Sequence, residues 1–206
     1  FSNNEKIMHC VKPMKRAADR MVNLTAQLLA CGLGGRYHPK PLVISDYVNS
    51  IVLSMRQNIP DSVRMTFNPT MDVPRVTVDP NQVSMVISAV IENAVEAVGK
   101  DGFIQISCEK EMLNEALQRE HPNYEPGPYV CLHVEDNGKG MDSKTLEKVY
   151  EPFFTTHFVG RGLGMSAAYG IVMNHGGLIC IESKLDVGTS VRIYLPPAED
   201  GGSKGE

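Results

Sequence analysis

The stretch VEDNGKGMDSKTLEKVYEPFFTTHFVGRGLGMS, residues 134–166, decides the fold through two groups of closely spaced glycines. The first group follows an alternating apolar segment that ends at Asp136. A carboxylate at a strand end beside Gly138 and Gly140 can face a pocket where the backbone must approach a ligand closely. Without a nearby cation, this carboxylate suits a neutral donor such as an exocyclic amine. An ordinary turn is the alternative, because Asp-Asn-Gly is common in β-hairpins.

The second group, GRGLGMS at residues 160–166, places three glycines at alternate positions before a predicted helix. Free backbone N–H groups at a helix N-terminus form an anion site. Arg161 could add a charged hydrogen bond to a phosphate. The preceding EPFFTTHFV is not a strand, so the pattern does not fit a dinucleotide-binding fingerprint. It predicts a mobile lid with a glycine hinge.

A helix with a complete start signal lies upstream of these glycines. In DPNQ, Asp79 is expected to be the N-cap, Pro80 the first helical residue and Gln82 the third. This helix would carry Asn93 at the edge of its apolar face, and Gly99 would end it. A neutral amide oxygen suits Mg²⁺ that is otherwise held by water and phosphate, although an isolated asparagine more often bonds locally.

The remaining periodicity predicts an α+β fold. Further helices are expected to begin at Ser45 or Asp46 and at about Gly164. Two strands follow each helix, which favours a two-layer α/β sandwich: a mixed, mostly antiparallel sheet with the helices on one face. The expected strands are 63–67, 76–79, 104–109, 130–135, 178–183 and 190–195, with a surface insert at about 112–128.

Composition limits the class of protein. The 206 residues are 42% hydrophobic, which suits one ordinary domain and an extra element. The net charge of −4 argues against a nucleic-acid partner. No apolar run is long enough to span a membrane, so we expect no membrane contact by this chain. No signal peptide is visible. Five widely spaced cysteines predict buried thiols in the cytoplasm rather than zinc ligands or disulfides.

The two ends of the chain are expected to lie outside this domain. Apolar residues from Ile7 to Leu28 recur at heptad-like spacing, which predicts a helix that pairs with a partner helix; packing within one chain is the alternative. The expected organisation is an N-terminal helix in 1–35, a linker in 36–41, the α+β domain in 42–198 and a disordered tail in 199–206. Because the first residue is Phe1, we expect a piece of a longer chain.

In their order and spacing, these motifs resemble the N, G1, F and G2 boxes of the ATP-binding domain of sensor histidine kinases, members of the GHKL ATPases with the Bergerat fold. The four motifs are the asparagine helix, D-x-G-x-G after a strand, EPFF, and G-x-G-x-G opening a helix. DVGTSVRIYLP resembles the last glycine–threonine box, and residues 16–32 resemble the end of the dimerisation hairpin. The resemblance covers residues 42–197, most of the chain.

This resemblance implies ATP and Mg²⁺ as ligands and assigns roles to residues of this sequence. Asp136 would accept the adenine amino group, and Asn93 would bind the Mg²⁺ that bridges the phosphates. The two glycine groups would be hinges on either side of a short ATP lid. The other implied nucleotide-binding residues are Ala97, Gly138, Gly140, Met141 and Thr189 at the base, Phe154 in the lid, and Gly160, Arg161, Gly162, Leu163, Gly164 and Met165 at the phosphates.

The implied function is phosphoryl transfer in a two-component phosphorelay, from ATP to a histidine and then to an aspartate on a response-regulator receiver domain. The implied protein is a cytoplasmic kinase domain that forms a homodimer through the N-terminal helix, whether or not the full-length chain is membrane-anchored. The phosphoaccepting histidine is expected to be missing from this chain. His9 is followed by Cys10 rather than an acidic residue, and His157 and His175 fall in the lid and at a helix end.

One position departs from the family pattern. Ala89 stands where a second asparagine is common, four residues before Asn93. Glu92 or Glu96 could substitute for it, or could be solvated helix charges. Gyrase, mismatch-repair and chaperone ATPases, the alternative function, place a water-activating glutamate in this helix, and Ala89 argues against them. A degenerate fold that only dimerises is a third class, and the intact glycine motifs argue against it.

Overall fold

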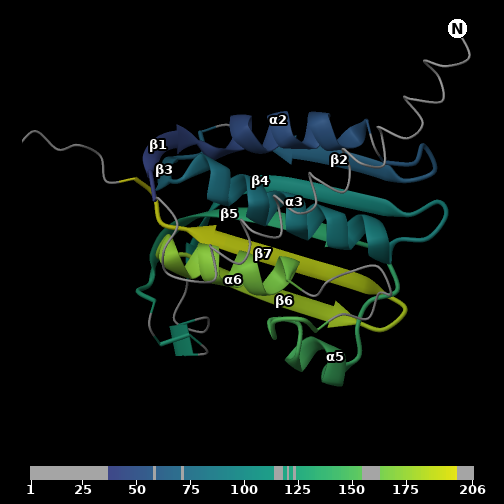
Figure 1. The fold of residues 1–206 in the computed structure, drawn as a ribbon. Coiled ribbons are helices and arrows are strands. Elements are labelled where there is room, and N and C mark those ends of the chain that lie inside the picture. The colour runs from purple at the N-terminus through teal and green to yellow at the C-terminus, as the bar shows by residue number, and fades with distance from the viewer. Residues whose placement is uncertain are drawn as a thin grey trace, which may run out of the picture.

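The computed structural model describes most of the chain, and the main feature of this part is a five-stranded sheet with three helices on one face (Figure 1). That part is residues 37–57, 59–70, 72–113, 118–119, 121–122, 124–154 and 163–198. The strand order is β2-β4-β5-β7-β6; only β2 and β4 are parallel, and the other neighbours are antiparallel. The predicted mixed, mostly antiparallel sheet is therefore confirmed. The strands are β2 (Arg64–Pro69), β4 (Phe103–Leu113), β5 (Gly127–Asp136), β7 (Gly188–Leu195) and β6 (Leu178–Lys184).

Helices α2 (Ile44–Arg56), α3 (Pro80–Ala97) and α6 (Gly164–Asn174) cover one face of this sheet, with α3 between the other two (Figure 1). Apolar residues recur every three or four positions in the helices and at alternate positions in the strands, so each layer presents an apolar surface to the other. These surfaces form the main core, which includes Val83, Ile87, Ile91, Ile104, Ile106, Leu132, Ile171 and Ile193.

A small antiparallel pair, β1 (Lys40–Val43) with β3 (Arg75–Val78), lies beside the main sheet. β1 starts within the stretch expected to be a linker, because prolines exclude a helix but are tolerated in an edge strand. β1 runs directly into α2, so this helix begins at Ile44 and the predicted start at Ser45 or Asp46 is wrong. Val43 occupies the N-cap position without any side-chain hydrogen bond.

The start of α3 is confirmed and also anchors the chain that enters the domain. Asp79 accepts hydrogen bonds from the backbone N–H groups of Asn81 and Gln82, and its other oxygen accepts from the His38 N–H at 2.8 Å. The Asp79 N–H donates to Nε2 of His175, the C-cap of α6, at 2.9 Å. The entering chain is therefore attached to the N-terminus of α3 and the C-terminus of α6.

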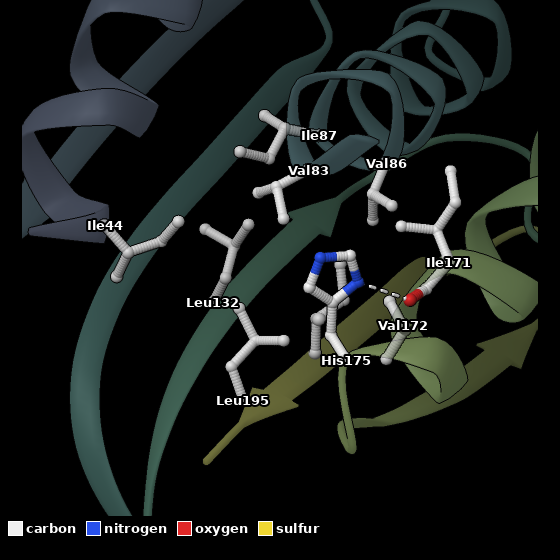
Figure 2. A pocket seen from close by; sticks show the side chains of 10 residues that line it. Ile44, Val83, Val86, Ile87, Leu132, Ile171, Val172, His175 and Leu195 are labelled. Atoms are coloured by element: carbon white, nitrogen blue, oxygen red, sulfur yellow. Dashed lines mark hydrogen bonds between the residues drawn. The ribbon is translucent and has the colours of Figure 1, made fainter. Parts of the chain in front are cut away.

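His175 is buried among apolar side chains of both helix and sheet layers (Figure 2). Its Nδ1–H donates to the Ile171 carbonyl at 2.7 Å, which leaves Nε2 as the acceptor for Asp79. The Tyr37 ring meets the imidazole edge-on at a centroid distance of 5.1 Å. Glycines end α6 as predicted, because Gly176 adopts a φ of +67° directly after the helix.

The opposite face of the sheet carries a smaller apolar cluster of Leu113, Cys131, Leu178 and Tyr194. Tyr124 packs against it and donates to the Gly177 carbonyl at 2.9 Å. β4 and β5 extend to Leu113 and from Gly127, so the predicted insert at 112–128 is shorter than expected. The short helix α5 (Ser143–Glu147), capped by Asp142, was not predicted from the sequence.

Burial of the thiols is confirmed for Cys108 and Cys131. Burial raises the pKa of Cys108 to about 12. Within the described ranges, none of the helices combines the length and apolarity that crossing a bilayer requires. The predicted N-terminal helix, Cys10, Cys31, His9, His157 and the tail lie outside the described residues.

Candidate nucleotide-binding site

Asp136 is the central residue of the candidate site and lies at the end of β5. Only 6% of its surface is exposed. Its Oδ1 accepts from the Gly138 N–H at 2.8 Å, and the carboxylate also accepts from the backbone of Thr189. Burial raises the pKa of Asp136 above its ordinary value despite these two hydrogen bonds, and nearby Glu135 raises it further. A further neutral donor would stabilise the ionised form, so the carboxylate is suited to recognise one.

The glycines of the first group allow close packing. A Cβ on Gly138 would lie 2.6 Å from the Ala97 carbonyl and 2.7 Å from Asp136 Oδ1. This closeness lets the Lys139 N–H donate to the Ala97 carbonyl at 3.1 Å. Gly140, with a φ of +60°, has no room for a Cβ against the backbone of Lys184. The family resemblance implies a hinge here, and in the structure this loop packs between α3 and the β6–β7 hairpin.

The β6–β7 hairpin holds this loop from the other side. Gly188, with a φ of +137°, packs against the backbone of Asp136, where a Cβ would overlap the carbonyl oxygen. Ser183 accepts from the Met141 N–H at 2.9 Å and lies 2.9 Å from Oγ1 of Thr189. Ser183 was missed in the sequence. Its position could have been predicted from a hairpin centred on Asp186, because in such a hairpin Ser183 lies directly opposite Thr189, which was predicted.

The C-terminal half of α3 brings Asn93 and Ala97 to the same helix face, one turn apart. Asn93 is exposed, whereas Ala97 is half-buried against Gly138. Partial burial raises the pKa of Glu92, with a contribution from the like charge of Glu96, although Glu92 keeps substantial contact with solvent.

The first residue of α6 covers Ala89. A Cβ on Gly164 would lie 3.6 Å from Cβ of Ala89, and only 7% of Ala89 is exposed. The small side chain at position 89 therefore lets the start of α6 approach α3, one turn before Asn93.

The N-terminus of α6 has the form of an anion site. Leu163 is its N-cap and is almost fully buried, and among the described residues no side-chain hydrogen bond caps this helix start. Ser166 instead donates to the Leu163 carbonyl at 3.1 Å, so it does not occupy the first N–H groups. Uncapped N–H groups at a helix start are available to phosphate oxygens. Met165 is buried, and Gly160, Arg161 and Gly162 lie outside the described residues.

The segment between the two glycine groups is attached to α6 and β6 through Tyr150. Its ring packs on Tyr169 at a centroid distance of 4.8 Å, and its hydroxyl donates to the Ile179 carbonyl at 3.2 Å. Phe154 is half-buried, whereas Phe153 is 71% exposed with a φ of +70°. Tyr150 was not predicted, since nothing in a single tyrosine indicates its distant partners.

An apolar pocket beside His175 is a different place in the molecule. Core residues line it, among them Val83, Val86, Ile171 and Val172 (Figure 2). It lies near the C-terminal end of α6, whereas Leu163 and Gly164 form the N-terminal end. We therefore assign this pocket to the core.

Metal binding by the protein alone finds little support in the described ranges, which contain no group of three histidine, cysteine or acidic residues placed to hold an ion. Asn93 offers a single exposed amide oxygen. This donor fits Mg²⁺ whose other positions are filled by phosphate and water.

Comparison with known protein families defines the class. The family described as histidine kinase-, DNA gyrase B- and HSP90-like ATPase matches residues 78–199, more than half of the chain. The chain therefore belongs to this ATPase family. Within it, the relatives favour the histidine kinase type over the gyrase type.

Two relatives illustrate this. Sensor kinase CckA of Brucella abortus is 30% identical over 185 residues, covering 89% of this chain and 20% of CckA. Sensor histidine kinase ZraS of Escherichia coli K12 is 26% identical over 184 residues, covering 89% of this chain and 36% of ZraS. The chain thus spans only a fifth to about a third of these relatives.

Solved structures show the same fold. The catalytic domain of histidine kinase ThkA aligns with a TM-score of 0.64 and 24% identity, covering 78% of this chain and 96% of that domain. ThkA in complex with the response regulator TrrA aligns with a TM-score of 0.66 and 21% identity, covering 89% of this chain and 49% of ThkA. The expected Bergerat-type α+β sandwich is confirmed.

Proposed function

We propose that this domain binds ATP with Mg²⁺ between α3, the loop after β5 and the start of α6, and donates the γ-phosphoryl group to a histidine. The observation that carries the proposal is the buried carboxylate of Asp136. Gly138 holds it beside Ala97, on the helix that also presents Asn93. Base, metal and phosphate ligands would thus come from three adjoining elements.

Each element would have one task in this reaction. Asp136 would accept the adenine amino group, and Met141, Ala97 and Thr189 would surround the base. The α6 N-terminus, together with residues 160–162, would bind the phosphates. Mg²⁺ held by Asn93 would supply charge neutralisation on the phosphates. Catalysis would then rest on positioning and electrostatic stabilisation, as in phosphoryl transfer generally.

We further propose that the phosphoryl group passes on to an aspartate of a response regulator. The support is that CckA and ZraS are named as sensor kinases and that ThkA was solved with a response regulator. The heptad-like residues 7–28 would form the homodimer, and a cytoplasmic location would give access to ATP and to the regulator.

The gyrase-type alternative requires a glutamate that activates water. Ala89 occupies the expected position and is buried under Gly164. Glu92 is the remaining candidate, and its raised pKa is the observation in favour. Steady ATP hydrolysis that Glu92→Gln abolishes would support this alternative over the kinase.

Calorimetry with a non-hydrolysable ATP analogue and Mg²⁺ tests the proposal. Asp136→Asn places an amide where an acceptor is needed and should weaken binding about 10- to 100-fold, the effect of losing one hydrogen bond to a charged group. Glu135→Gln is the matched control, because this exposed neighbour points to the opposite face of the sheet and should bind as the wild type does. Equal affinity of Asp136→Asn and the wild type would refute the assignment.

A further inference from the structure

Ser183 of β6 connects two residues that would lie beside the base. Its Oγ is 2.9 Å from the Met141 N, 2.9 Å from Thr189 Oγ1 and 3.1 Å from the Gly188 carbonyl oxygen. Ser183 pairs with Thr189 across β6 and β7, and Thr189 pairs with Asp136 across β7 and β5. Directly opposed residues in antiparallel strands share a face, so Asp136, Thr189 and Ser183 form one row.

Only one placement of the hydroxyl protons satisfies all three contacts of Ser183. A serine hydroxyl has one proton to donate and two lone pairs to accept. The Gly188 carbonyl can only accept, so the Ser183 proton is donated there. The Met141 N–H can only donate, so it uses one lone pair of Ser183. The contact to Thr189 is then made by the threonine proton, which is donated to the second lone pair.

This arrangement leaves Thr189 without a proton for a ligand. Its Oγ1 presents only lone pairs toward the base, as does the carboxylate of Asp136. Nearby backbone donors are also used within the protein: the Gly138 N–H and the Thr189 backbone bond to Asp136, and the Met141 N–H bonds to Ser183. These groups of the described site therefore offer acceptors to a ligand.

We propose that Ser183 is a positioning residue that fixes the direction of the Thr189 hydroxyl and thereby makes the site select a 6-amino purine over a 6-oxo purine. This inference rests on the proposed ATP-binding function. An amino group donates to the acceptors of Asp136 and Thr189. A carbonyl at the same position meets lone pairs instead and leaves buried groups unpaired, and such a mismatch discriminates more strongly than a small difference in the size of an apolar group.

Calorimetry of this chain with Mg²⁺ and either ATP or inosine triphosphate tests the proposal. The two ligands differ in the amino or oxo group and, with it, at N1, which is a lone pair in adenine and an N–H in hypoxanthine, so the measured quantity is the change in preference that each variant causes relative to the wild type. The wild type should prefer ATP. In Ser183→Ala the Thr189 hydroxyl is free to rotate and donate to the oxo group, so the ATP preference should fall about five- to tenfold, the effect of one neutral hydrogen bond. Ser183→Thr keeps a hydroxyl and should retain the preference.

Two further variants separate this role from a general structural one. Ser190→Ala removes a hydroxyl on the other face of the sheet, where it bonds to His133 at 2.8 Å, and should leave the preference unchanged. In a Thr189→Val background, Ser183→Ala should have no further effect on the preference, because there is no hydroxyl left to orient. Thermal unfolding confirms that each variant is folded.

The outcomes distinguish the inference from the function it rests on. A wild-type chain that binds neither nucleotide overturns both. A wild type that prefers ATP, with a Ser183→Ala variant that keeps the full preference or loses both ligands equally, overturns the role of Ser183 and leaves the ATP-binding function intact.

Discussion

Replacement of Asp79 by alanine tests how the entering chain is fixed to α3. Its Oδ1 accepts from the backbone N–H groups of Asn81 at 2.9 Å and Gln82 at 3.3 Å. Its Oδ2 accepts from the His38 N–H at 2.8 Å, across 41 residues of sequence. The carboxylate is thus both a helix cap and a tertiary anchor, and alanine removes both functions.

The magnitude follows from these two functions. Loss of an N-cap costs about 1 kcal/mol of unfolding free energy. Loss of a hydrogen bond between a charged acceptor and the His38 amide costs about 1.5–3 kcal/mol more. Together they predict a loss of about 2.5–4 kcal/mol, which lowers the midpoint of thermal unfolding by roughly 5–15 °C for a domain of this size.

The loss should also depend on pH. Burial alone would raise the pKa of Asp79, but the N–H donors of His38, Gln82 and Asn81 and the nearby His175 outweigh it and lower the pKa. A carboxyl group with a lowered pKa in the folded state stabilises the fold above its ordinary pKa of about 3.9. This stabilisation is lost as the pH falls through the folded pKa, so the difference between wild type and Asp79→Ala should shrink as the pH falls below about 4.

Urea unfolding followed by circular dichroism at neutral and acidic pH measures these differences. Asp79→Asn keeps an oxygen acceptor at the cap and should lose clearly less than Asp79→Ala. Asp142→Ala is the matched control, since Asp142 caps α5 through the Thr145 N–H and is exposed. A loss in Asp79→Ala no greater than that in Asp142→Ala, or one that is independent of pH, would refute the anchoring role.

Three further predictions concern the candidate site and its supports. Gly188→Ala should cost about 2–4 kcal/mol of unfolding free energy and weaken nucleotide binding, because the added Cβ would overlap the Asp136 backbone. Gly170→Ala is the control and should cost neither, because its Cβ meets nothing within 4 Å. Equal stability of the two variants in urea unfolding would contradict the prediction. His175→Ala should cost about 2–4 kcal/mol of unfolding free energy, since it leaves the buried Asp79 N–H unpaired and opens a cavity. ¹⁵N NMR of the wild type should find the Nδ1–H tautomer of His175. The other tautomer would contradict the hydrogen bonds from His175 to Ile171 and from Asp79 to His175. Because burial raises the pKa of Asp136, nucleotide affinity should fall with decreasing pH before an ordinary aspartate would protonate; calorimetry that finds constant affinity down to about pH 4 would reject this.

Local interactions are what the sequence by itself determined about this protein. The start of α3 could be predicted because a cap, a proline and the first helix turn are all contained in DPNQ. Alternating apolar residues specified β5 and β7, and the order of the motifs specified the family, which the match to residues 78–199 confirmed. Each of these signals lies within a few residues or in their order along the chain.

Contacts between distant segments were decided only by the tertiary structure. The start of α2 shifted because β1 runs into it, and β4 and β5 lengthened because their pairing continues toward Leu113 and Gly127. The closely spaced Gly138 and Gly140 indicated a close backbone approach, but only the fold shows that they pack against Ala97 and Lys184. The physical reason is that such packing depends on strand register and on the approach of two layers, which no single segment contains.

The candidate site shows the same division. Asp136 was predicted from the order and spacing of several sequence motifs, whereas Ser183 acquires its role only when the hairpin register places it beside Thr189 and Met141. His175 stood at a predicted helix end, but the hydrogen bond that it accepts comes from a residue 96 positions away. The chemistry of each side chain is fixed by the sequence, while its hydrogen-bond partner, and hence the direction of its protons, is fixed by the fold.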